Sequence, residues 1–241
     1  MINIQNIWKQ FNGEYVHRGI SLDIPDRETV VVLGKSGGGK SVLLKMIVGL
    51  IKPDRGNIVV DGNEVRTMSY RNLRAHRMKF GFLFQGAALL DSLTVGENVA
   101  LPLRYHRRKK VTDIPARVKR ALETVGLEGV EQMMPSSLSG GMRKRVGLAR
   151  ALVYEPPYVL YDEPTTGLDL ETADGINLLI NDLRNTLGVT SIVVTHDIRS
   201  AFVVGGLFAI LNEGKIIMTG TADEIRNSTN EEVRKYIDSN L

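Results

Sequence analysis

The chain has 241 residues, of which 24% are charged and 43% hydrophobic, and its formal net charge is +4. This composition is ordinary for a globular protein and argues against a disordered, a collagen-like or an integral membrane chain. The absence of cysteine excludes disulfides, thiolate metal ligands and cysteine nucleophiles. Glycine is unusually frequent, with 24 residues, and it is typical of places where the backbone takes a positive φ or approaches a ligand closely.

The amino terminus and the longest apolar segment indicate where in the cell the protein is expected. Residues 1–12 contain Asn, Gln, Trp and Lys where a secretory signal would have an apolar core. The apolar run 201–211 contains two glycines and is too short to span a bilayer. We therefore expect a cytoplasmic protein that docks on a membrane partner.

The first part of the chain alternates between strand and helix patterns. Residues 2–7 and 20–24 are predicted to form two edge strands. Thr29–Gly34 is a continuous apolar run that stops at glycine, which is typical of a buried parallel strand. Ser41–Leu50 follows with the length and the apolar repeat of a helix. These segments predict a unit of strand, glycine-rich loop and helix.

The middle of the chain is predicted to be helical, and strands are predicted on both sides of it. Helical periodicity dominates between about residues 89 and 154, most clearly at 116–125 and 141–153. Further strands are predicted at 57–61, 79–85, 158–161, 190–195 and 207–211. A hairpin turn is expected at 212–215 and a charged helical segment at 222–241. This order favours one α/β core with an inserted helical subdomain.

Eight consecutive residues fit the phosphate-loop pattern G-x-x-x-x-G-K-[ST]: Gly34, Lys35, Ser36, Gly37, Gly38, Gly39, Lys40 and Ser41. Phosphate oxygens need several converging N–H donors, so the backbone must wrap around them without Cβ atoms in the way. The following helix adds free N–H groups and its dipole. Lys40 would reach the β- and γ-phosphates and the Ser41 hydroxyl would bind Mg²⁺. The flanking strand and helix distinguish this loop from a chance glycine-rich turn.

Two carboxylates end another predicted strand. Residues 158–161 are apolar, and Asp162 and Glu163 follow them directly. Because the carboxyl ends of neighbouring parallel strands meet at the ligand, both side chains are expected near the phosphate loop. Asp162 could hold Mg²⁺ through water, and Glu163 could orient or deprotonate the attacking water as general base. A solvated strand end is the alternative when these two residues are taken without the loop.

Further short motifs resemble those of ATP-binding cassette (ABC) ATPases, in the family's order and over essentially the whole chain. The segment LSGGM at 138–142 resembles the LSGGQ signature, with Met in place of Gln at the fifth position. Gln85 looks like the Q-loop glutamine, His196 like the switch histidine and the GLD of 167–169 like the D-loop. The chain is therefore identified as a member of this family on its motifs.

The resemblance implies one nucleotide-binding domain over residues 1–241. Its core would be an α/β P-loop NTPase with an N-terminal antiparallel β subdomain, comprising residues 1–88 and 154–221. The helical subdomain with the signature would comprise 89–153, and 222–241 would form a C-terminal extension.

The family also implies roles for individual residues around ATP. Glu163 would be the general base, and His196 would contact the γ-phosphate and stabilise developing charge. Gln85 would touch Mg²⁺ and the water, and it would sense the transport partner. Val42, directly after the phosphate loop, would also contact the nucleotide.

The signature implies that two subunits share each ATP. In the family, the signature of one subunit closes over the ATP bound to the phosphate loop of the other, which implies a homodimer. Ser139, Gly140 and Gly141 would supply this second phosphate-binding element, and an ordinary helix N-cap at Ser139 is the alternative. Phe11 has the family's spacing for an aromatic that stacks on adenine, or it is a local core residue. The competing aromatics are Trp8 and Tyr15.

Longer segments are similar to one group within the family, the ATPase subunits of MCE-type (Mla) phospholipid transporters. They are 84–95, 97–100 and 139–152, and the tail 231–241 resembles an extension that reaches the partner ATPase subunit in that group. The resemblance implies a peripheral protein on the cytoplasmic side of the bacterial inner membrane. Its partners would be a second ATPase subunit, an integral membrane permease and an MCE substrate-binding protein. A frayed surface helix is the alternative for the tail.

Two segments could face that membrane complex. An apolar floor for a coupling helix of the permease could come from Leu89, Leu90, Leu93 and Val95, for which ordinary core packing is an equal alternative. The basic run 104–110 could face anionic lipid headgroups, although a solvated loop is the stronger interpretation. The positive charge is not gathered into a stripe along the sequence, so no nucleic-acid partner is expected.

Other functions remain open at this point. One is the ATPase of a different ABC importer or exporter, for amino acids, metals or lipoproteins. Another is a soluble ABC ATPase of translation or DNA repair, but one phosphate loop, one signature and no long heptad tract favour a transporter subunit. A nonhydrolytic nucleotide-binding module is less favoured because Glu163 is in place.

Overall fold

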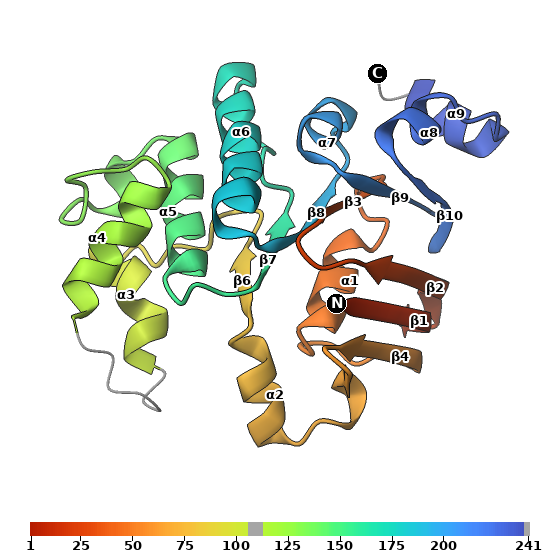
Figure 1. Ribbon diagram of the computed structural model, residues 1–241, viewed down its shortest axis with the longest axis horizontal. Coiled ribbons are helices and arrows are strands. Elements are labelled where there is room, and N and C mark those ends of the chain that lie inside the picture. The colour runs from red at the N-terminus through yellow and green to blue at the C-terminus, as the bar shows by residue number, and fades with distance from the viewer. Residues whose placement is uncertain (106–112, 239–241) are drawn as a thin grey trace.

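The computed structural model describes residues 1–105 and 113–238, which form two β-sheets and the helices that cover them (Figure 1). The larger sheet has the strand order β10-β9-β3-β8-β7-β6. Its neighbouring strands β9, β3, β8, β7 and β6 run parallel, and β10 pairs with β9 in the antiparallel sense. The strand bounds are β3 (Thr29–Gly34), β6 (Phe80–Leu83), β7 (Tyr158–Asp162), β8 (Thr190–Thr195), β9 (Leu207–Asn212) and β10 (Lys215–Gly220).

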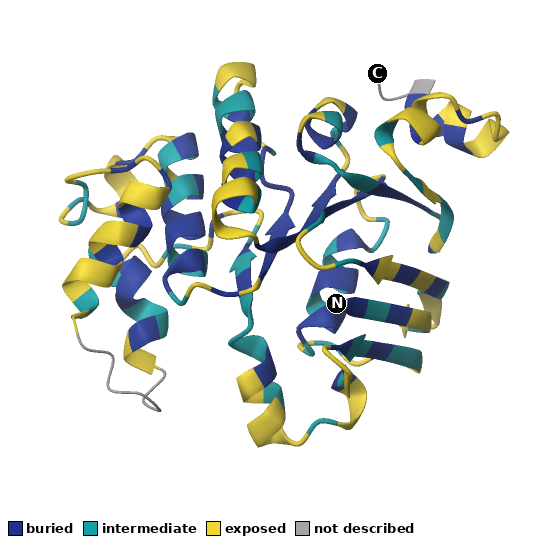
Figure 2. Cartoon of the chain, viewed as in Figure 1, coloured by how far each residue is buried: buried dark blue, intermediate teal, exposed yellow. Residues whose placement is uncertain are grey.

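Both faces of this sheet are covered, which explains the continuous apolar runs. Every residue of β3, β7 and β8 is buried. Side chains alternate between the two faces, so Val31 and Leu33 join one hydrophobic core while Val30 and Val32 join the other. Figure 2 shows these strands as the buried centre of the molecule.

The smaller sheet is antiparallel and has the order β2-β1-β4-β5. Its strands are β1 (Ile2–Phe11), β2 (Glu14–Ile24), β4 (Arg55–Val60) and β5 (Asn63–Glu64). The prediction that 2–7 forms an edge strand is wrong, because β1 lies between β2 and β4. Its apolar side chains, such as Ile2 and Ile4, pack with α1 (Lys40–Ile47) in the core beneath the larger sheet.

The helices that enter the chain between β6 and β7 lie together beside the β6 edge of the sheet (Figure 1). They are α3 (Val95–Tyr105), α4 (Ile114–Thr124) and α5 (Gly140–Leu152). The expected helices at 116–125 and 141–153 correspond to α4 and α5 within two residues. Three further helices were not predicted from the sequence: α2 (Tyr70–Arg77), α6 (Leu170–Leu187) and α7 (Ile198–Val204).

The carboxyl-terminal part folds back onto the sheet. The predicted turn at 212–215 joins β9 to β10, with Glu213 and Gly214 at φ of 46° and 78° as a tight hairpin requires. The chain continues into α8 (Ala222–Arg226) and α9 (Glu231–Asp238). Val233 and Ile237 of α9 are buried in the core of the same chain, whereas residues 239–241 of the predicted partner-reaching tail lie outside the described part. Within the described ranges, none of the helices has the length and apolarity to cross a membrane.

Candidate functional site

The phosphate loop is the connection between β3 and α1. Gly37 and Gly39 have φ of 77° and 91°, a region that side-chain-bearing residues rarely adopt. A Cβ at Gly39 would also lie 2.5 Å from Val16 Cγ1 and 2.7 Å from His17 Nε2. Gly39 is the N-cap of α1 and has no side chain to cover the first N–H groups of the helix. The loop therefore presents bare backbone and a helix amino terminus, the arrangement that binds phosphate.

Lys40 connects the loop to the turn after β7. Its side chain is 5% exposed, and Nζ donates to the carbonyl oxygens of Gly34 and Lys35 at 2.8 and 3.0 Å. The same atom lies 3.0 Å from Glu163 Oε1. The ammonium is thus held between two carbonyls of the loop and the Glu163 carboxylate, largely away from solvent.

Ser41 and Asp162 meet beside this ion pair. The Ser41 hydroxyl donates to Asp162 Oδ1 at 2.7 Å. Burial raises the pKa of Asp162, and the hydrogen bond from Ser41 partly offsets that effect. A hydroxyl and a carboxylate side by side are hard oxygen donors of the kind that bind Mg²⁺ together with phosphate and water. The two residues therefore fit such an ion, although the described residues contain no group of three His, Cys, Asp or Glu that could hold a metal alone.

Glu163 lies at the centre of a hydrogen-bonded cluster. Its Oε2 accepts hydrogen bonds from Thr166 Oγ1 at 3.1 Å, from Thr195 Oγ1 at 3.3 Å and from His196 Nδ1 at 2.9 Å. Burial alone would raise the pKa of Glu163, but the contacts with His196 and Lys40 hold it below its usual value. The side chain is consequently an oriented carboxylate, as a general base requires.

Of the three predicted catalytic residues, Glu163 is buried, whereas His196 and Gln85 are exposed. His196 follows β8, and its side chain is 45% exposed beside the buried Glu163. Gln85 lies two residues beyond β6 with an exposed side chain, and its carbonyl oxygen accepts a hydrogen bond from Lys144. Direct contacts thus unite Lys40, Ser41, Asp162, Glu163 and His196, whereas Gln85 joins the site through its backbone.

Lys144 is a residue of this site that was not predicted from the sequence. Its ammonium also donates to the carbonyl oxygen of Glu163 at 3.1 Å. One signal was available, because Lys144 occupies a position of the buried face of α5 together with Gly141, Leu148 and Leu152. A lysine at such a helical spacing is expected to use its charge inside the protein.

The signature residues lie at the start of α5. Ser139 is the N-cap, and its hydroxyl accepts from Met142 N at 3.2 Å. A Cβ at Gly141 would lie 2.4 Å from Thr172 Cγ2, at the beginning of α6. The helix-cap alternative is thus part of the structure, and close packing on α6 gives Gly141 a second reason to be glycine. A contact of this segment with ATP would require another subunit.

The candidate adenine-stacking residue lies at the end of β1. Phe11 is 42% exposed, and Lys9 Nζ lies 5.2 Å from its ring centroid. The competing aromatics Trp8 and Tyr15 pack edge to face with ring centroids 5.4 Å apart. Tyr15 is almost as exposed as Phe11, at 41%, so the ring contact between Trp8 and Tyr15 is the observation that favours Phe11 as the ring available to a base.

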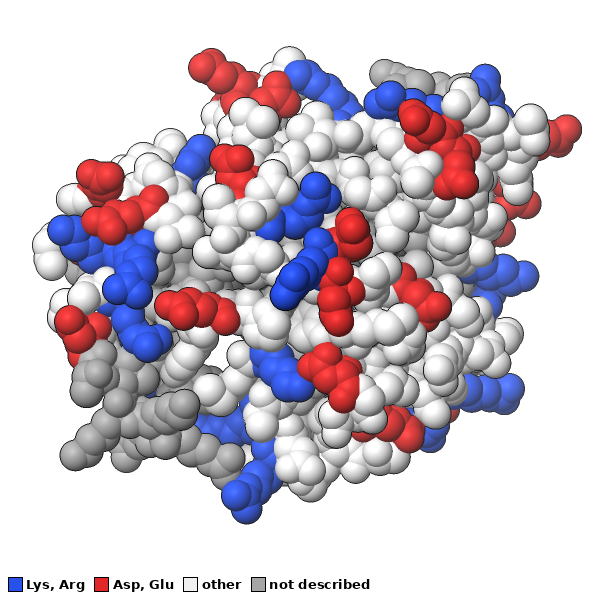
Figure 3. All heavy atoms as spheres, viewed as in Figure 1, with Lys and Arg blue, Asp and Glu red and all other residues white. Residues whose placement is uncertain are grey.

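The predicted permease contacts are distributed between core and surface. Val95 is fully buried and Leu89 packs against the core, whereas Leu90 is 46% exposed. Residues 106–110 of the basic run lie outside the described residues. On the face shown in Figure 3, basic and acidic side chains are interspersed.

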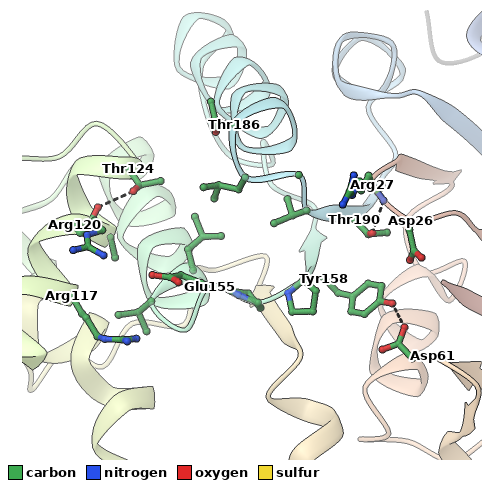
Figure 4. Close-up of a pocket in the computed structure, with 18 residues that line it drawn as sticks. Asp26, Arg27, Asp61, Arg117, Arg120, Thr124, Glu155, Tyr158, Thr186 and Thr190 are labelled. Carbon is green, nitrogen blue, oxygen red and sulfur yellow. Dashed lines mark hydrogen bonds between the residues drawn. The ribbon is translucent and has the colours of Figure 1, made fainter. Parts of the chain in front are cut away.

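A separate hollow of about 720 Å³ lies at the opposite end of the strands. Its walls include Tyr158 and Thr190, the first residues of β7 and β8, whereas the phosphate loop follows the last residue of β3. Figure 4 shows Arg117 and Arg120 of α4 on one side of it and Tyr158 on the other. The hollow therefore does not belong to the site built around Lys40.

Comparisons with known proteins identify the family of this chain. The chain matches the ABC transporter family over residues 17–166. It is 39% identical over 238 residues to the intermembrane phospholipid transport system ATP-binding protein MlaF of Escherichia coli K12, covering 99% of this chain and 88% of that protein. It is also 39% identical over 236 residues to a probable ribonucleotide transport ATP-binding protein, mkl, of Mycobacterium leprae, covering 98% of this chain and 68% of that protein.

Solved structures show the same architecture. A dimeric ATP-binding cassette in a post-hydrolysis state, bound to ADP and Pi, is 34% identical with a TM-score of 0.83, covering 92% of this chain and 98% of that chain. A part of the ABC transporter complex cbiONQ of Clostridium perfringens is 28% identical with a TM-score of 0.86, covering 100% and 95% of the two chains. The predicted α/β cassette fold is confirmed by these likenesses.

Proposed function

The chain belongs to the ABC transporter family, and from this premise we propose that it is the ATP-hydrolysing subunit that powers phospholipid transport between bacterial membranes. The proposal that the cargo is phospholipid rests on the 39% identity to E. coli MlaF, which extends over 99% of this chain. The contacts among the phosphate loop, Asp162 and Glu163 support the ATPase activity.

The residues that meet at the carboxyl ends of the strands have separable roles. The glycines of the loop and the first turn of α1 bind phosphate through backbone N–H groups. Lys40 neutralises charge on the terminal phosphates once its ammonium turns from Glu163 toward them. Glu163 accepts a proton from the attacking water, and His196 orients this carboxylate through its 2.9 Å contact.

Mg²⁺ belongs to the proposal as a cofactor that accompanies ATP. Ser41 and Asp162 would hold it, since their oxygens already lie 2.7 Å apart at the loop. Gln85 would approach it from the turn after β6. Mg²⁺ would neutralise negative charge on the phosphates, as it does in phosphoryl-transfer reactions in general.

A second copy of this chain would complete the nucleotide site. Ser139, Gly140 and Gly141 lie at a helix start on α5 and would close over ATP bound to the partner subunit. The dimeric cassette bound to ADP and Pi supports this arrangement by analogy. An integral membrane permease and an MCE substrate-binding protein are the proposed further partners, which would hold the chain on the cytoplasmic face of the inner membrane.

The cargo can be tested by purifying the tagged chain from native membranes and identifying the proteins that accompany it. A permease and an MCE protein are expected, and ATP turnover of the complex should respond to phospholipid vesicles. Co-purification with a solute-binding protein, and turnover that responds to ribonucleotides or amino acids instead, would contradict the phospholipid proposal. A Glu163→Gln complex, which should retain its partners but not turnover, is the matched control.

A further inference from the structure

Lys144 is a buried lysine between two turns of the nucleotide site. It lies on α5 and is 5% exposed. Its ammonium donates to the backbone carbonyls of Gln85 and Glu163, at 3.1 Å for the latter. These carbonyls belong to the turns that follow β6 and β7, which are neighbouring parallel strands. One side chain therefore joins the signature helix, the Gln85 turn and the Glu163 turn.

Glu163 has a backbone conformation that needs such support. Its φ is 50°, in the left-handed region that is costly for a residue with a long side chain. Its N–H donates to the carbonyl oxygen of Val194 at 2.9 Å, and its own carbonyl accepts from Lys144. Hydrogen bonds thus hold both the N–H and the carbonyl group of Glu163, and its side chain contacts Lys40 and His196.

The turn after β6 is held by the same face of α5. Arg150 donates to the carbonyl oxygens of Ala87 and Ala88 at 2.5 and 2.6 Å. Gly147, between Lys144 and Arg150 on that face, approaches so closely that a Cβ would lie 3.1 Å from Ala87 Cβ. Of these three α5 residues, Lys144 is the one whose contacts also include Glu163.

The energetic cost of this position indicates what the lysine does. Burial lowers the pKa of Lys144, while the charges of Glu163 and Asp162 act in the opposite direction. An ammonium is buried at a large desolvation cost unless acceptors surround it. A hydrophobic residue would fill the same volume without that cost, so the contacts with the two carbonyls are the reason for a lysine here.

We propose that Lys144 is a positioning residue for ATP hydrolysis, which holds the Glu163 backbone in its left-handed conformation and ties it to the Gln85 turn. The inference rests on the proposed role of Glu163 as general base. Because Lys144 lies five residues after Ser139 on one rigid helix, a shift of the signature would change the geometry of Glu163 directly.

The test is Lys144→Met, which keeps the length and apolar stem of the side chain and removes its donors. In the full-length protein we expect kcat to fall at least 10-fold while the ATP dissociation constant changes less than 3-fold, because Lys144 acts on the base and not on the phosphates. Lys144→Gln, which retains a donor, should recover part of kcat and also serves if Lys144→Met does not fold. Lys119→Met, at an exposed lysine of α4, is the control and should match wild type.

A double-mutant cycle separates positioning from a general loss of structure. In single-turnover measurements, Lys144→Met should cost clearly less in the Glu163→Gln background than in wild type, because it acts through Glu163. Full additivity, a kcat within 2-fold of wild type, or equal losses of turnover and ATP affinity in folded variants would overturn the proposal. Turnover near the wild-type rate in Glu163→Gln alone would instead reject Glu163 as the base.

Discussion

Lys40 and Glu163 form a buried ion pair, with Nζ 3.0 Å from Oε1 and side chains that are 5% and 7% exposed. Lys40 is the first residue of α1, in the connection that follows β3, and Glu163 directly follows β7. These two strands are not neighbours in the sheet, but both pair with β8. The pair brings together the cation proposed to bind phosphate and the carboxylate proposed as the base. It also means that Lys40 must leave Glu163, at least in part, to reach a phosphate.

The first prediction concerns the base. Glu163→Gln preserves the shape of the side chain and its contact with His196, so ATP affinity should stay within about 3-fold of wild type, whereas kcat should fall by roughly 100-fold or more. Nucleotide titration and steady-state ATPase rates measure the two quantities. Glu123→Gln, at an exposed position of α4, is the matched control. Hydrolysis near the wild-type rate in Glu163→Gln would show that another group takes the proton.

The second prediction concerns the phosphate-loop lysine. Lys40→Ala removes the ammonium and its ion pair with the Glu163 carboxylate. We expect the ATP dissociation constant to rise by about 10- to 100-fold, the range expected for lost hydrogen bonds between charged groups. Isothermal titration with ATP and Mg²⁺ measures it, with Lys52→Ala as the exposed control. Unchanged affinity in a folded Lys40→Ala protein would contradict the phosphate-loop assignment.

The third prediction compares two glycines of the loop in the absence of nucleotide. Both have positive φ, but a Cβ would clash with Val16 and His17 only at Gly39, since nothing lies within 4 Å of that position at Gly37. Gly39→Ala should therefore lower the free energy of unfolding by about 1–3 kcal/mol more than Gly37→Ala. Urea unfolding of both variants tests this, and equal losses would show that backbone strain dominates at both sites.

The fourth prediction concerns pH and His17. This side chain is fully buried, and its Nε2 lies 3.0 Å from the Gly39 carbonyl oxygen, so Nε2 donates and Nδ1 carries no proton. Nδ1 has no hydrogen-bond partner among the described residues. Burial lowers the pKa of His17 to about 4, from the usual 6.5. The unfolded chain thus takes up a proton at a higher pH than the folded protein does.

The lowered pKa of His17 contributes to the free energy of unfolding. This contribution is fully present above pH 6.5, is lost as the pH falls toward 4, and amounts to about 3 kcal/mol. In His17→Gln, which retains a donor toward Gly39 but does not titrate, this part of the pH dependence should disappear. Urea-unfolding curves at pH 7.5, 6, 5 and 4 measure the difference between the two proteins. Parallel pH profiles would show that His17 is not protonated on unfolding.

Local patterns were sufficient for much of this protein. A phosphate loop was predicted at residues 34–41 because glycine spacing, a buried strand before it and a helix after it are all properties of neighbouring residues. The structure has this strand, connection and helix. The buried strands at 158–161 and 190–195 followed from continuous apolar runs, and the hairpin at 212–215 followed from its turn residues. The ABC motifs predicted the family, which the comparison over residues 17–166 confirms.

Some features depended on neighbours that are remote in the chain. The alternating apolar pattern of residues 2–7 is the same at an edge and in the middle of a sheet, so only the pairing with β4 placed β1 inside. The helical spacing of Lys144 is compatible with a buried position, but its acceptors lie in other elements. They became apparent only when α5 packed against the turns after β6 and β7.

Local sequence was thus sufficient to predict which residues would bind phosphate and which carboxylates would act beside them, since spacing along the chain specifies a loop and the end of a strand. Tertiary structure decided how these residues meet. The strand order brings Lys40 to Glu163 and Ser41 to Asp162 across 121 or more positions of the chain. Tertiary packing also brings Lys144 to the carbonyl oxygen of Glu163 and His17 to that of Gly39. Burial and acceptor geometry of this kind arise only when separate elements pack together.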